Sequence, residues 1–111
     1  MKILFTAEGN DWNALVDPRL GRAESLVLFD EESGEMTALS NLEALSMQHS
    51  GPYTAQKILD LAPDVIITGN GPGGRACDIL ERSNITVYVG AGGMRLKEAY
   101  DAFKSGKLER F

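Results

Sequence analysis

The stretch DVIITGNGPGGRACDIL, residues 64–80, decides the fold class because it reads as a strand, a glycine-rich turn and a helix in succession. The apolar run Val65–Ile67 predicts a buried strand. Ala76, Ile79 and Leu80 would share one face of the helix that follows. A strand that leads through a short turn into a helix is half of a βαβ unit, which favours an α/β fold with parallel strands.

The glycines of this turn, Gly69, Gly71 and Gly74, have the spacing G-x-G-x-x-G that dinucleotide-binding proteins carry after their first strand. Here the turn follows the fourth predicted strand, and no acidic residue stands about 20 positions further on to bind a ribose. Pro72 also lacks an amide donor for phosphate, so NAD is disfavoured. Two interpretations stay open: a turn that only needs glycine's backbone freedom, or a bare backbone that lets a bulky anion approach the helix N-terminus.

The rest of the sequence predicts further strands and helices on both sides of this stretch. Apolar runs of strand type precede and follow it, and a turn signal at Ser33-Gly34 makes two of them a hairpin. The expected strands are residues 2–6, 25–30, 36–40, 64–69 and 85–90, and the expected helices begin at Pro52, after the glycine turn and at Arg95. The fold class is therefore α/β, a five-stranded mixed sheet flanked by helices in the order β-β-β-α-β-α-β-α.

Length and composition are those of one globular domain covering residues 1–111, with 43% hydrophobic and 24% charged residues. No apolar run approaches the ~20 residues that span a bilayer, and the start of the chain has no signal-peptide pattern. We therefore expect a cytoplasmic protein without a membrane partner. A formal net charge of −5 argues against nucleic acid as a partner, because that affinity comes mainly from Lys and Arg on phosphates.

The chain has one cysteine, Cys77, and one histidine, His49. Neither an internal disulfide nor a zinc cage of Cys and His ligands can be built from them. A metal would have to arrive largely ligated, or be held with help from carboxylates or a second chain.

Three stretches together resemble the dinitrogenase iron-molybdenum cofactor biosynthesis family, which occurs as small NifX-like proteins and as the C-terminal part of NifB-like proteins. Residues 16–35 contain Arg19-Leu20-Gly21-Arg22-Ala23, similar to the family's Arg-Phe-Gly-Arg-Ala segment except at Leu20. Residues 49–80 resemble its His-Gly helix and Gly-x-Gly-Pro loop, and residues 85–108 resemble its last strand and helix. The resemblance covers nearly the whole chain.

The resemblance implies a ribonuclease H-like chain path and a non-enzymatic role. The cargo would be an iron-sulfur cluster precursor or the finished iron-molybdenum cofactor, with a cofactor-assembly protein as a partner. A two-metal nuclease is disfavoured, because such sites need converging carboxylates and the first strand, KILFT, has none. The alternative is a regulatory or protein-interaction domain that keeps the fold without a metal ligand.

Two candidate metal ligands follow, each with an ordinary structural alternative. His49 stands at the mouth of a helix, where the family carries His, and its imidazole could ligate iron or molybdenum or simply lie in a loop. Cys77 could add a thiolate or pack as a small apolar side chain.

The candidate cofactor-binding residues also include two cations and the glycine backbone. Arg19 and Arg22 could hold an anionic ligand or pair with the acidic surface. The loops after Thr6, Thr68 and Val89 should meet the His49 segment where the strands end. The full predicted cofactor-binding set is His49, Arg19, Arg22, Gly69, Gly71 and Gly73.

Overall fold

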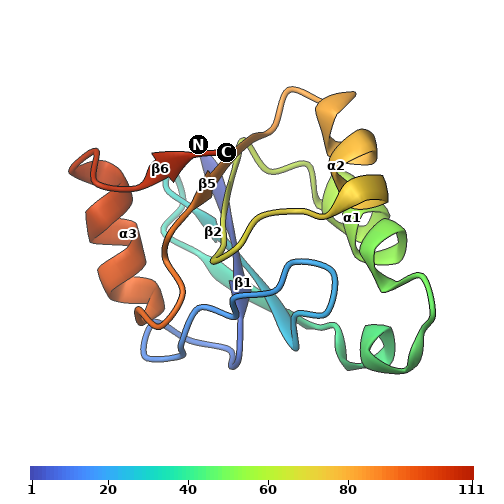
Figure 1. The fold of residues 1–111 in the computed structure, drawn as a ribbon. Coiled ribbons are helices and arrows are strands. Elements are labelled where there is room, and N and C mark those ends of the chain that lie inside the picture. The colour runs from blue at the N-terminus through green and yellow to red at the C-terminus, as the bar shows by residue number, and fades with distance from the viewer.

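The computed structural model describes all 111 residues and contains one mixed sheet of six strands with helices on both faces (Figure 1). The sheet order is β3-β2-β1-β4-β5-β6, in which β1, β4 and β5 are parallel and the other pairings are antiparallel. The strands are β1 (Lys2–Ala7), β2 (Ser25–Asp30), β3 (Met36–Ser40), β4 (Val65–Ile67), β5 (Thr86–Val89) and β6 (Glu109–Arg110). The helices are the short 3-10 helix η1 (Leu42–Ser46), α1 (Ser50–Leu61), α2 (Gly74–Glu81) and α3 (Leu96–Lys104).

The sheet is buried on both faces, with α1 and α2 on one side and α3 on the other (Figure 1). Successive residues of β1 point to opposite faces, so Ile3 packs in the cluster that contains Leu96 of α3. Leu4 packs in the cluster that contains Ile58 of α1. All four side chains are fully buried, and such burial contributes roughly 1.5–3 kcal/mol for each side chain.

The predicted mixed α/β architecture is confirmed, but the count of five strands is wrong, and the chain adds η1 after β3 and β6 after α3 to the predicted elements. The additional strand, β6, has two exposed residues and pairs with β5 through its backbone. It lacks the apolar pattern by which a sequence indicates a strand. The likeness to ribonuclease H stays a prediction, and none of the helices has the length and apolar character that crossing a bilayer requires.

A buried polar network attaches the loop before β2 to the start of α1. The side-chain amide of Asn41, which is fully buried, donates to the carbonyl oxygen of Ala23 at 2.9 Å and to Thr54 Oγ1 at 3.1 Å. Thr54 in turn donates to the carbonyl oxygen of Gly21 at 2.9 Å. Because buried carbonyl groups without a partner are costly, this network fixes the loop against α1.

We expect Asn41→Ala to lower the free energy of unfolding by about 1–3 kcal/mol, because the carbonyl of Ala23 loses its buried donor. Chemical denaturation followed by circular dichroism measures the change. Asn84→Ala, at an exposed turn position, is the matched control and should change stability little. Equal effects of the two substitutions would contradict a structural role for the network.

Candidate anion-binding site

A cavity of about 330 Å³ opens where three segments meet: the loop after β1, the start of α1 and the loop between β4 and α2. Its lining is mostly polar or glycine, and it includes three arginines. The lining residues are Arg19, Leu20, Gly21, Arg22, Ser50, Gly51, Pro52, Asn70, Gly71, Gly73, Arg75 and Ala76.

The segments meet because parallel strands end at the same edge of the sheet. Thr6, one residue before the end of β1, and Thr68, which follows β4, share a buried hydrogen bond of 2.7 Å between their hydroxyl groups. The amide of Asn70 donates to Pro18 O at 2.8 Å, and the amide of Gly90 donates to the carbonyl oxygen of Gly69 at 3.0 Å. The expected meeting of these loops is therefore confirmed.

Two helices begin at this cavity, and no side chain caps either of them. Ser50 and Gly51 of α1 line it, as do Gly73, the N-cap residue of α2, and Arg75 in the first turn. The first amide groups of a helix have no partner within the helix, and the helix dipole places partial positive charge there. Both features favour an anion in the cavity.

Arg19 is held in place by a buried carboxylate. Asp17 is fully buried and accepts hydrogen bonds from the Nε of Arg19 at 3.2 Å and from its Nη2 at 3.4 Å. It also accepts from the backbone amides of Arg19 and Glu24. The hydrogen bond to Asp17 raises the pKa of Arg19, so its guanidinium is a fixed, permanently charged donor with free N–H groups left for a ligand.

Arg22 connects the cavity to η1. Its Nη2 donates to the carbonyl oxygen of Leu45, the only hydrogen bond that this side chain makes. The guanidinium carries five N–H donors, so a ligand in the cavity could still be bound by the others.

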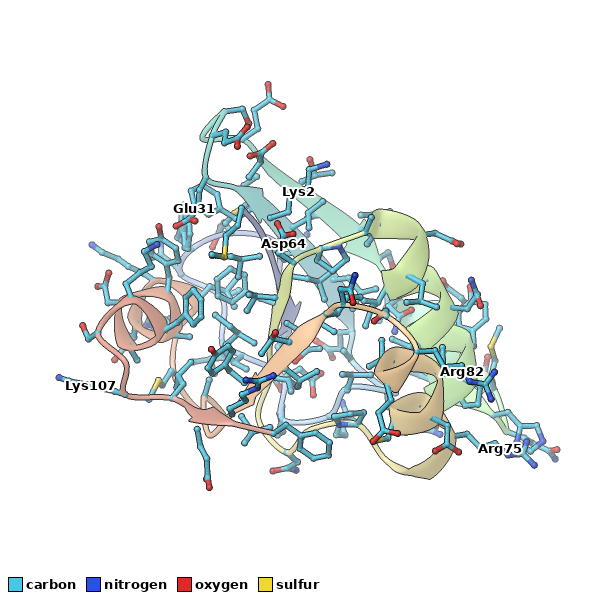
Figure 2. All side chains as sticks on the ribbon, turned by 90° about the horizontal axis from the view of Figure 1, so that it is seen from above. Lys2, Glu31, Asp64, Arg75, Arg82 and Lys107 are labelled. Carbon is cyan, nitrogen blue, oxygen red and sulfur yellow. The ribbon has the colours of Figure 1, made fainter.

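Arg75 was missed by the sequence interpretation. It is exposed and lines the cavity, and its side chain takes part in no hydrogen bond or ion pair. Figure 2 places it at the outer edge of the molecule beside α2, away from Lys107. A cation in the first turn of a helix faces the positive end of the dipole, where acidic residues are the favoured ones. This unfavourable placement of a cation, directly after Gly74, is the feature of the sequence from which Arg75 could have been predicted as a binding residue.

The two predicted metal ligands are not brought together in this cavity. His49 is the exposed N-cap residue of α1, next to the lining residue Ser50, and its side chain does not cap the helix. Cys77 lines a second cavity of about 130 Å³ with Pro72 and Phe111. Burial, followed by a hydrogen bond of 3.5 Å from its thiol to Glu81, raises the pKa of Cys77. The structure contains no cluster of three or more Cys, His, Asp or Glu side chains that could hold a metal ion.

The predicted glycines divide into two groups. Gly71 and Gly73 line the cavity, whereas Gly69 is buried and does not. A Cβ atom built on Gly69 would lie 2.5 Å from the Cα of Pro18, so this glycine permits the close approach of two loops.

A family model described as dinitrogenase iron-molybdenum cofactor matches residues 1–106. The chain belongs to this family.

Two solved structures share the fold of this family member. The apo form of the orange protein from Desulfovibrio gigas superposes with a TM-score of 0.91 at 29% identity, covering 99% of this chain and 92% of that one. The NMR structure of a NifB candidate protein from Thermotoga gives a TM-score of 0.83 at 29% identity, covering 98% and 91%. No curated protein sequence matches the chain.

We expect Arg75→Ala to stabilise the ligand-free protein by about 0.3–1 kcal/mol at low ionic strength, because it removes a cation from the N-terminal turn of α2. The matched control is Arg82→Ala at the C-terminal end of the same helix (Figure 2), where a cation is favoured. Urea denaturation measures the free energy of unfolding of both variants. Because both replace arginine with alanine, the difference between them reports the dipole effect rather than alanine's helix propensity. A gain of equal size in Arg82→Ala would contradict this interpretation.

Proposed function

We propose that this protein binds and carries an anionic metal-sulfur cluster, an iron-sulfur or iron-molybdenum cofactor or its precursor, without catalysing a reaction. The observation that carries the proposal is the cavity that combines three arginines with the N-termini of α1 and α2. Membership of a family named for the iron-molybdenum cofactor supports a cluster as the anion.

The donors at the cavity suit a ligand that accepts hydrogen bonds over a broad surface. Guanidinium groups form charge-assisted hydrogen bonds, and bare glycine backbone at Gly71 and Gly73 lets a bulky ligand approach the amide groups. The cluster would be held mainly by hydrogen bonds and charge, because the lining contains no thiol, imidazole or carboxylate. Release of the cargo from the residues that line the cavity would therefore break hydrogen bonds rather than metal-ligand bonds.

His49 is the candidate for a direct metal bond, since it is exposed beside the rim residue Ser50. Neutral imidazole suits iron, and no hydrogen bond of its ring would have to be broken first. We leave Cys77 out of the proposed cluster site because it lines the second cavity and its raised pKa disfavours the thiolate form that binds metals.

The proposal also covers the domain, the cellular location and the partner of the carrier. Residues 1–111 would act as one domain in the cytoplasm, and a cofactor-assembly protein would be the partner that loads or unloads the cluster. The second candidate role is a protein-interaction domain without a ligand. A protein that retains no cluster would have this role instead.

Anaerobic mixing with a synthetic iron-sulfur cluster carrying small thiolate ligands should leave iron and visible absorption with the protein on a sizing column. We expect Arg75→Ala to weaken retention by about tenfold, which corresponds to ~1.4 kcal/mol of binding free energy. Arg82→Ala, outside the cavity, is the matched control and should retain iron as the wild type does. Failure of the wild type to retain iron would leave the interaction-domain role.

A direct bond from His49 to iron is tested separately from retention by charge. We expect His49→Ala to lose about tenfold in affinity and to change the visible absorption of the bound cluster, because a lost protein ligand alters the metal's electronic environment. Glu32→Ala, an exposed position on the hairpin between β2 and β3, should change neither. An unchanged spectrum and affinity in His49→Ala would remove the direct bond from the proposal and keep the arginine site.

A further inference from the structure

The loop between β4 and α2 forms a wall that the two cavities share. Asn70, Gly71 and Gly73 line the arginine cavity, while Pro72, between them, lines the second cavity together with Cys77. A change in the shape of this short loop therefore alters both cavities at once.

Little in the loop's own hydrogen bonding fixes its shape. The amide of Asn70 is bonded to Pro18, and the amide of Cys77 to Gly73, but the amides of Gly71 and Gly73 donate no hydrogen bond within the protein. Pro72 has no amide hydrogen. Glycine segments have many accessible backbone conformations, so such a loop keeps one shape only where other groups pack against it.

Phe111 packs directly against the loop. Gly71 has φ +85°, and a Cβ atom built on it would lie 2.7 and 2.8 Å from the Cδ1 and Cε1 atoms of the Phe111 ring. The ring thus occupies the space that any side chain at position 71 would need. Phe111 is held there by the bond from its amide to Val87 O at 2.8 Å and by the pairing of β6 with β5.

We infer that Phe111 is a positioning residue for the cargo: by packing on Gly71, its ring keeps the loop, with the unbonded amides of Gly71 and Gly73, in the shape that lines the arginine cavity. The inference rests on the proposed function, and it concerns a segment beyond residues 1–106, the part matched by the family model. Phe111 is 57% exposed, so loss of its side chain should change overall stability little. Without the ring, the loop adopts its binding shape for only part of the time, and apparent affinity falls in proportion.

The test uses Phe111→Ala in the full chain, with Phe111→Tyr as the variant that keeps the ring. Leu42→Ala removes an apolar side chain of similar exposure, 56%, that lines neither cavity. In the ligand-free protein, 15N relaxation of the backbone amides of Gly71 and Gly73 reports how firmly the loop is held. Release of iron from the loaded protein, measured with the synthetic iron-sulfur cluster, reports the effect of the loop on the arginine cavity.

We expect Phe111→Ala to lower the order parameters of the Gly71 and Gly73 amides and to speed iron release by roughly threefold to tenfold, with thermal unfolding changed little. Phe111→Tyr and Leu42→Ala should match the wild type in both measurements. Unchanged iron release in Phe111→Ala, in a wild type that retains iron, overturns the inference. If the wild type retains no iron, the proposed function fails instead, and unchanged order parameters in Phe111→Ala would overturn the positioning of the loop independently.

Discussion

The parallel pairing of β1 with β4 is the constraint on which the candidate site depends. It places Thr6 and Thr68 side by side, and their buried hydroxyl groups bond to each other while Thr6 also donates to the carbonyl oxygen of Asp17 at 2.8 Å. That contact fixes the backbone of Asp17, whose carboxylate then holds Arg19. A shift of β1 against β4 by one residue would place the two hydroxyl groups on opposite faces of the sheet. The loop that carries Asp17 and Arg19 would then lose this attachment.

The charge of the cavity is opposite to that of the protein as a whole. The formal net charge of −5 disfavours long polyanions, whose binding requires many cations spread over a surface. Locally, Asp17 offsets the charge of Arg19, so the positive potential comes mainly from Arg22, Arg75 and the two helix N-termini. A concentrated positive site on an acidic surface selects a small, compact anion over an extended one.

The sequence predicts what local patterns determine and misses what depends on distant contacts. Apolar periodicity and turn residues indicated five strands and three helices, because each of these elements carries its own pattern. Strand β6 depends on pairing with β5 and has no such pattern. Four of the predicted cofactor-binding residues line the cavity: Arg19, Arg22, Gly71 and Gly73. Gly69 instead serves a contact with Pro18 that only the folded chain creates.

The glycine spacing therefore does not by itself specify a ligand. In a dinucleotide site the backbone after the first strand faces pyrophosphate, but here Gly69, the first glycine of the pattern, is covered by Pro18 from the loop after β1. Arg75 follows the last glycine, Gly74, and adds a cation at a position where a dinucleotide site uses amide groups alone. Neighbouring loops and that added charge, rather than the spacing of the glycines, decide what this turn can bind.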